Sequence, residues 1–315
     1  MGRRRWCRSD RWRSRRAPVA PRTLLLACSV ALSLWSGLST GTAAASPPPS
    51  GGYWLAAANG GVLGFGSAQT YGSIATTGMG TINASVVGIA ATPDGKGYWL
   101  AAADGGVFAF GDAAFMGSMG GQHINAPIVG IAAAAGDRGY WLVAADGGVF
   151  AFGSATFMGS TGGQHLNASI AGIASTTSGR GYWLVGSDGG VFAYGDAVFH
   201  GSMGGTRLNA PVVGMAADPT SSGYWLVASD GGIFNFDAPY YGSLGYLPLN
   251  SPIVGITPSA DAAGYWLVAA SGQVYFIDVP SFNTDVYGCL GRPIVGIAAT
   301  SLPPVASWPT CKPTG

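Results

Sequence analysis

The chain is 315 residues long, contains 53 glycines, and only 9% of its residues are charged. Its net charge of +1 hides an uneven distribution, because nine of its thirteen arginines lie within the first 22 residues. From Ser46 onward there are six basic side chains and thirteen aspartates, which gives a net charge near −7. Since this part of the chain is acidic, we exclude binding of nucleic acid, which requires a basic surface.

Residues 1–45 have the order of a secretory signal peptide. The arginines precede an apolar run at residues 24–38 and small residues at 42–46, so we predict cleavage after Ala45. A retained membrane anchor is disfavoured, because a run of about 15 residues is short for a transmembrane helix. We therefore expect a secreted or cell-envelope protein with no membrane span after cleavage. Residues 14–16 (Ser-Arg-Arg) leave the general and the twin-arginine export routes open.

After a Pro- and Gly-rich leader at residues 46–51, the sequence is a tandem repeat. The tripeptide Gly-Tyr-Trp recurs at intervals of 45, 42, 42, 42 and 41 residues. Its six occurrences begin at Gly52, Gly97, Gly139, Gly181, Gly223 and Gly264. A period of about 40–45 residues without helical periodicity is typical of a β-propeller, in which each repeat forms one blade.

One unit is predicted to form four short strands. Ile128–Ala132, Tyr140–Ala144 and Val149–Phe152 are apolar runs, and a fourth strand is expected around Phe157–Ser160. Between the second and third strands, Asp146-Gly147 predicts a two-residue hairpin turn in which both residues have positive φ. The second strand has no polar face, which indicates that it is buried on both sides, as in blades stacked face to face.

The ends of the repeat region indicate how many blades there are. The region begins at Gly52 with a second strand and ends with a first strand at residues 293–298. Pairing of these two segments would complete a sixth blade and remove exposed sheet edges. We therefore predict an all-β fold over residues 52–298, a six-bladed β-propeller with four-stranded blades, closed by pairing of its N- and C-terminal strands.

A Pro-rich tail follows at residues 299–315. Cys289 and Cys311 are the only cysteines after the predicted cleavage site, and we expect them to form a disulfide in an exported protein. This bond would fasten the tail beside the closing strand. Two separate thiols are the alternative.

The units resemble the G-Y-W-L-V-x-x-D-G-G-V-F-A-F-G-D-A repeats of secreted actinobacterial β-propeller proteins over most of residues 52–298. In that group, similar repeats often accompany separate cell-wall or polysaccharide hydrolase domains. The resemblance therefore implies an accessory or surface-binding role for the repeats, and it carries over no catalytic residue.

Side chains that recur in the units are interpreted as structural. We expect the tryptophan of each second strand to pack between blades rather than to bind sugars. These tryptophans are Trp54, Trp99, Trp141, Trp183, Trp225 and Trp266. The hairpin residues Asn59, Asp104, Asp146, Asp188 and Asp230, and Asp112, Asp196 and Asp237 in the following turn, are expected to stabilise those turns.

The candidate binding residues lie in the link from one unit to the next, at positions that vary between units. We expect this link and the second-to-third-strand hairpin to open on one face, where converging loops favour ligand binding. The candidates are Gln122, His123, Asn125, Gln164, His165, Asn167, Arg207 and Asn209. A solvated loop without a ligand is the alternative.

The sequence contains no motif for a nucleophile, a dinucleotide or a zinc protease site. His123 and His165 lie one blade apart, too far to share a metal, and His200 is interpreted as a satisfied surface histidine. A glycoside hydrolase or lyase is the enzymatic alternative, but there is no Glu, and only Asp278 and Asp285 lie outside the repeated turns. We predict a non-catalytic binding or scaffold protein without cofactor or metal, which recognises cell-wall polysaccharide or an extracellular protein. A purely structural surface protein is the other alternative.

Overall fold

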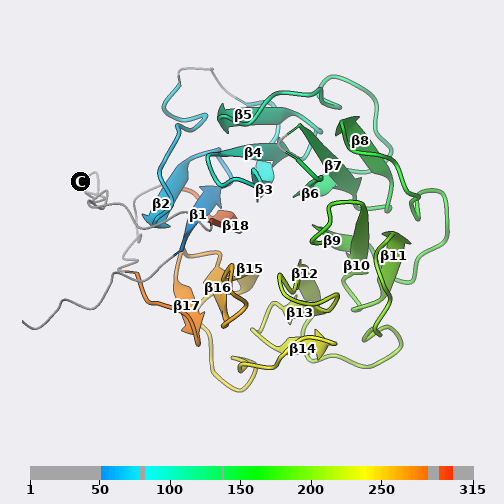
Figure 1. The fold of residues 1–315 in the computed structure, drawn as a ribbon. Helices are drawn as coiled ribbons and strands as arrows, with labels where there is room; N and C mark the ends of the chain where they lie inside the picture. The colour runs from blue at the N-terminus through cyan, green and yellow to red at the C-terminus, as the bar shows by residue number, and fades with distance from the viewer. Residues whose placement is uncertain (1–50, 78–81, 137, 283–290, 301–315) are drawn as a thin grey trace, which may run out of the picture. The chain divides into compact units, whose positions relative to one another are not determined.

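The computed structural model describes residues 51–77, 82–136, 138–282 and 291–300. These residues form eighteen β-strands and no helix, and the strands build six three-stranded antiparallel sheets (Figure 1). The predicted all-β class is confirmed.

Each sheet contains three kinds of strand, which follow the order of the repeat. The first strands are β3 (Val86–Ala91), β6 (Ile128–Ala133), β9 (Ile170–Ser175), β12 (Val212–Ala217), β15 (Ile253–Pro258) and β18 (Ile294–Thr300). The second strands are β1 (Gly52–Ala57), β4 (Gly97–Ala102), β7 (Gly139–Ala144), β10 (Gly181–Gly186), β13 (Tyr224–Ala228) and β16 (Tyr265–Ala269). The third strands are β2 (Val62–Gly66), β5 (Val107–Gly111), β8 (Val149–Gly153), β11 (Val191–Gly195), β14 (Ile233–Phe236) and β17 (Val274–Ile277).

The sheets are joined through their first strands. Five sheets consist of consecutive strands, whereas the sixth joins β18 to β1 and β2, with Leu55 opposite Ile297. The first strands contact one another in the order β18, β3, β6, β9, β12 and β15, and β15 contacts β18. In Figure 1 they lie around a common centre. The two ends of the repeat region therefore belong to one sheet.

The second strands are buried along their whole length, as their two apolar faces predict. Every residue of β7 is buried, and the same holds for the other five second strands. The predicted bounds of the first three strands of the unit lie within one residue of those of β6, β7 and β8. Period and strand composition were thus sufficient to place these strands.

The predicted fourth strand at Phe157–Ser160 is wrong, because this segment pairs with no strand and each sheet has three strands rather than four. Side chains satisfy its backbone instead. The Trp141 indole donates a hydrogen bond to the carbonyl of Thr156 (2.8 Å), and the Tyr182 hydroxyl donates one to that of Gly159 (2.6 Å). Since these partners replace a strand ladder, the segment needs no strand neighbour.

The predicted two-residue hairpin is also wrong. The loop of β7–β8 has three residues, because the N–H of Ala144 bonds to the carbonyl of Gly148 and that of Gly147 bonds to the carbonyl of Ala144. Only Gly147 has positive φ (81°), as in a three-residue loop that ends in a glycine bulge. Asp146 accepts a hydrogen bond from the N–H of Gly148 (2.9 Å), which confirms its role in the turn.

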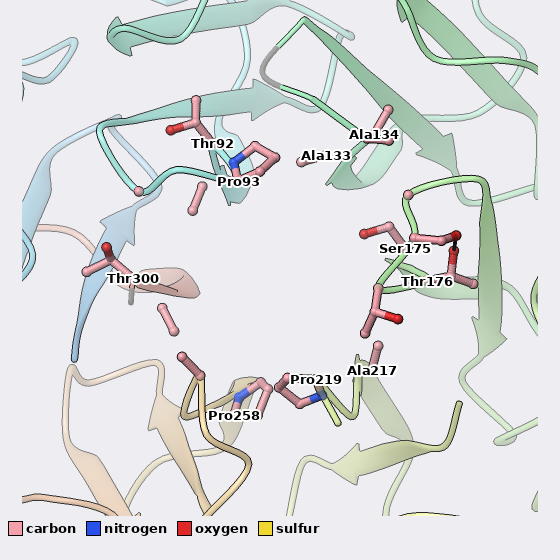
Figure 2. A pocket seen from close by; sticks show the side chains of 18 of the residues that line it. Thr92, Pro93, Ala133, Ala134, Ser175, Thr176, Ala217, Pro219, Pro258 and Thr300 are labelled. Atoms are coloured by element: carbon pink, nitrogen blue, oxygen red, sulfur yellow. Dashed lines mark hydrogen bonds between the residues drawn. The ribbon is translucent and has the colours of Figure 1, made fainter. Parts of the chain in front are cut away.

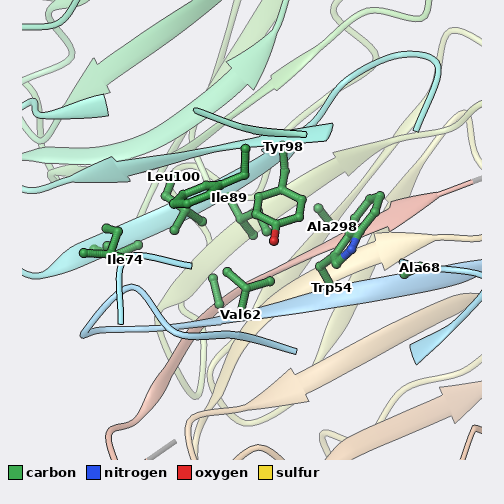
Figure 3. Close-up of a cluster of buried hydrophobic side chains, with 11 residues drawn as sticks. Trp54, Val62, Ala68, Ile74, Ile89, Tyr98, Leu100 and Ala298 are labelled. Atoms are coloured by element: carbon green, nitrogen blue, oxygen red, sulfur yellow. The ribbon is translucent and has the colours of Figure 1, made fainter. Parts of the chain in front are cut away.

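The core lies between neighbouring sheets (Figure 3). All six repeat tryptophans are at most 2% exposed, which confirms that they pack between sheets. Each indole lies against a tyrosine ring of the next sheet, with centroids 5.1–5.7 Å apart. The pairs are Trp54–Tyr98, Trp99–Tyr140, Trp141–Tyr182, Trp183–Tyr224, Trp225–Tyr265 and Trp266–Tyr53. The last pair joins the two ends of the repeat region.

The predicted signal peptide (1–45), nearly all of the leader (46–51) and most of the tail (299–315) lie outside the described residues, as do Cys289 and Cys311. The cleavage site and the disulfide stay predictions.

Candidate functional site

The links between sheets are held against the hairpins. The N–H of Met119 bonds to the carbonyl of Gly105 (2.9 Å), and that of Ile128 bonds to the carbonyl of Ala103 (2.9 Å). The same contact recurs from Thr161 to Gly147. These bonds place the links and the hairpins on one face, before the start of the first strands. We call this the link face.

All eight predicted binding residues are exposed on the link face. Three of them precede β6 (Gln122, His123 and Asn125), and the other five occupy the matching links before β9 and β12. No hydrogen bond or ion pair joins any two of the eight in the part of the chain that the structure describes. Their role in binding therefore stays a prediction.

The link before β15 carries two exposed apolar side chains that the sequence prediction missed. Tyr246 is 80% exposed and Leu247 is 44% exposed. They occupy the positions of Gly121 and Gln122 in the earlier link. A change from glycine and glutamine to tyrosine and leucine, at a place where no core needs them, was the signal in the sequence.

The opposite ends of the first strands surround a cavity of about 530 Å³ (Figure 2). Alanine, proline, serine and threonine side chains form most of its lining, among them Thr92, Ala134, Pro219 and Thr300. None of the described residues that line it is charged or aromatic. A six-residue strand spans roughly 20 Å. This axial cavity is therefore separate from the link face, and the sequence prediction did not include it.

A second cavity of about 420 Å³ adjoins the first, because Thr176, Thr177, Ser178 and Pro219 line both. It lies between the turn after β9 and the turn after β12, and we call it the turn cleft. Its other lining residues are Trp183, Asp196, Val198, Thr220, Ser221 and Ser222. The cleft thus combines hydroxyl groups, one carboxylate and a few apolar side chains.

The carboxylate of Asp196 is fixed from one side of the cleft. Ser178 donates a hydrogen bond to its Oδ2 (2.5 Å) and Thr176 donates one to its Oδ1 (2.9 Å). The hydrogen bond from Ser178, followed by that from Thr176 and the charge of Arg180, holds the pKa of Asp196 below its ordinary value. Asp196 therefore carries a negative charge at neutral pH.

His200 stands beside the cleft. Its Nε2 lies 3.0 Å from the hydroxyl of Ser222, and its Nδ1 lies 3.5 Å from Oδ2 of Asp237. The His200 side chain is 19% exposed and that of Asp237 is 61% exposed. The structure confirms a satisfied histidine, whose side chain is partly buried at the surface.

Asp237 does not have the position that the sequence interpretation gave it. It follows β14 directly and has φ of 48°, so it occupies the place of Gly195 rather than that of Asp196. The loop after β14 is one residue shorter than the loop after β11. This deletion explains the last Gly-Tyr-Trp interval of 41 residues.

Comparison with known proteins identifies the architecture. No family model and no curated protein matches the chain. Among solved structures, a chain in "Crystal structure of Nidogen/Laminin Complex" is similar, with a TM-score of 0.57 and 11% identity. The match covers 80% of this chain and 98% of that chain. The fold is β-propeller-like. In all, 924 chains of solved structures match, so the fold itself does not select a function.

In the residues that the structure describes, no helix is long and apolar enough to cross a membrane. The same residues contain no group of three or more His, Cys, Asp or Glu side chains that could hold a metal ion.

Proposed function

We propose that this chain is a secreted, non-catalytic binding propeller of six blades, closed by its terminal strands, and that its link face binds an extracellular protein. Closure is supported by the pairing of β1 with β18 and by the contact of Trp266 with Tyr53. The pairing with β18 also covers the edge of β1 that faces the centre, and an unpaired edge there would promote aggregation.

The exposure of the link face is the observation that carries the proposal. Eight polar side chains and Tyr246 stand out from links that backbone hydrogen bonds hold in place. Tyrosine and arginine are enriched among the residues that dominate protein–protein binding, and Arg207 belongs to the eight. The structural neighbour comes from a complex of two named proteins, which agrees with a protein partner. Cell-wall polysaccharide is the alternative partner at this face.

The partner can be tested with the immobilised mature protein (residues 46–315) and the extracellular fraction of the source cells. Substitution of His123, His165 and Arg207 by alanine should weaken retention of a partner, whereas Arg138→Ala, an exposed change at the opposite end, should not. Protease treatment of the fraction should abolish retention. If periodate oxidation abolishes it and protease does not, the partner is a glycan. Equal retention by the triple variant and the wild type would contradict the proposal.

Secretion can be tested separately. The protein recovered from the medium should begin at Ser46, as mass spectrometry of its N-terminal peptide will show. A protein that stays in the cell with residues 1–45 attached would contradict the signal peptide.

The enzymatic alternative is tested in the same samples. Asp278, which the sequence interpretation placed outside the repeated turns, follows β17 directly in the turn that Asp237 occupies after β14, and its side chain is exposed. A retaining or inverting glycosidase needs a second carboxyl group at a defined distance. We expect no release of reducing sugar from cell-wall polysaccharide, and release that Asp278→Asn abolishes would establish an enzyme.

A further inference from the structure

The turn cleft opens at a place where the repeat changes. In three earlier units, the residue before Gly-Tyr-Trp is a long cation, Lys96, Arg138 or Arg180. In the unit that begins at Gly223 it is Ser222, a short hydroxyl side chain that lines the cleft. The cation is also missing before Gly52 and Gly264, where the residues are Gly51 and Ala263, but only Ser222 places a hydroxyl group at this position.

Two further changes accompany Ser222. His200 occupies the position of Met158, and Asp237 occupies that of Gly195. A Cβ on Gly195 would lie 2.4 Å from the carbonyl of Arg180 and 3.1 Å from Cγ of Met158, so the shorter loop after β14 is needed to admit Asp237. The three new side chains contact one another through His200. They therefore form one polar wall beside the cleft.

The equivalent positions in the next unit show that this wall is specific to one sheet. There the residues are Tyr241, Ala263 and Asp278, and the Tyr241 hydroxyl donates to the carbonyl of Ala262. Ala263 has no side-chain hydroxyl that could bind a ligand. All three positions are polar only in the unit of Ser222.

The chemistry of the cleft points to one class of ligand. We propose that the turn cleft binds a neutral sugar residue, a site separate from the link face. Its hydroxyl oxygens, from Thr176, Ser178 and Thr220–Ser222, can accept hydrogen bonds from sugar hydroxyls. Thr176 and Ser178 donate their own protons to Asp196, and Thr220 and Ser221 donate theirs to Asp218. The Asp196 carboxylate accepts hydrogen bonds and repels anionic sugars. None of the cleft's ten lining residues, all of them described, is basic.

Size and apolar surface agree with this ligand. A volume of about 420 Å³ lies within the usual range for small-molecule sites, roughly 300–1,000 Å³. Trp183, Val198 and Pro219 give the cleft an apolar part for the C–H groups of a sugar ring. The residues Thr176–Ser178 line both the cleft and the axial cavity, so the two cavities adjoin.

Calorimetric titration with neutral hexose oligosaccharides, and with uronic acid oligosaccharides of the same length, tests the site. The mature protein should bind at least one neutral oligosaccharide and no acidic one. Ser222→Arg should lower this affinity by about tenfold or more, because the long side chain fills the cleft and displaces hydrogen-bonding groups. This variant should fold, since Arg138 and Arg180 occupy the same position in other units.

Matched variants separate this site from the link face. Asp196→Asn should weaken sugar binding, whereas Asp112→Asn, the same change in the sheet of β3–β5, should leave it unchanged. The link-face triple variant should keep sugar binding, so a failure of either proposal is visible without the other. Binding of no neutral sugar by the wild type, equal binding of acidic sugars, or unchanged binding by folded Ser222→Arg would overturn the inference.

Discussion

The indole of Trp266 lies 5.4 Å from the ring of Tyr53, measured between centroids, although the two residues stand at opposite ends of the repeat region. The same contact joins each of the other five neighbouring sheets. Each interface between sheets therefore uses the same pair of side chains. Its contribution to stability can be measured at one interface and compared with another.

Trp141→Ala should lower the free energy of unfolding by about 3–5 kcal/mol, as expected for removal of a fully buried tryptophan. Trp141→Phe should lower the free energy of unfolding by less, about 1–3 kcal/mol, because the carbonyl of Thr156 still loses its indole donor. Urea unfolding followed by circular dichroism measures both values. A loss below about 1 kcal/mol for Trp141→Ala would mean that the indole is not packed between sheets.

Two buried tyrosines should respond differently to loss of the hydroxyl. The Tyr140 hydroxyl donates to the carbonyl of Gly117 and accepts from the N–H of Met116, so Tyr140→Phe should cost about 1 kcal/mol or more. The buried hydroxyl of Tyr53 has no hydrogen-bond partner in the described part of the chain, so Tyr53→Phe should cost clearly less. Equal losses in urea unfolding would contradict the difference in hydrogen bonding between these two hydroxyls.

Stability should fall at alkaline pH. Burial raises the pKa of Tyr98 and of Tyr265 to about 12, above the value near 10 of an exposed tyrosine. The unfolded chain therefore loses these protons at lower pH than the folded protein does. This contribution is fully present below about pH 10 and is lost as the pH rises to about 12, by roughly 1.4 kcal/mol per pH unit for each tyrosine. Urea unfolding at several pH values measures the slope, which Tyr98→Phe should reduce. A flat profile over that range would contradict the burial of these hydroxyls.

Gly147 and Gly163 offer a matched test of the hairpin. Both have φ of 81°, but a Cβ on Gly147 would lie 1.7 Å from Oγ1 of Thr161, whereas one on Gly163 would meet nothing within 4 Å. Gly163→Ala should cost about 1–2 kcal/mol through backbone strain alone. Gly147→Ala should cost about 1–3 kcal/mol more, because Thr161 is buried and cannot move aside. Equal losses in thermal and urea unfolding would show that the link does not pack on the hairpin.

Much of the architecture could be predicted from the sequence, because the same strand pattern recurs in each repeat unit. The bounds of β6, β7 and β8 followed from apolar runs and glycine punctuation. The fourth strand failed because strand prediction assumes that backbone groups pair with backbone, whereas Trp141 and Tyr182 supply side-chain donors. No periodicity in the sequence indicates these long-range hydrogen-bond donors.

The candidate sites could also be predicted only in part from the sequence. Exposure of His123 and Arg207 could be expected from a polar link, and the structure places them there. The turn cleft and its polar wall could not be expected, because Ser222 lines the cleft through a single substitution and Asp237 joins the wall through a deletion after Phe236. Both changes are visible in the sequence as a missing cation and an interval of 41 residues. The sequence does not indicate that the turns after β9 and β12 lie side by side and form a cleft.

The most direct test of the account is hydrogen–deuterium exchange of β1 in the mature protein and in a chain that ends after Gly291. If β1 pairs with β18 to close the propeller, the β1 amides that face β18 and the N–H of Ala58, which bonds to the carbonyl of Pro293, exchange slowly in the mature protein and much faster in the shortened chain. Equal protection of β1 in both proteins would contradict closure by the terminal strands.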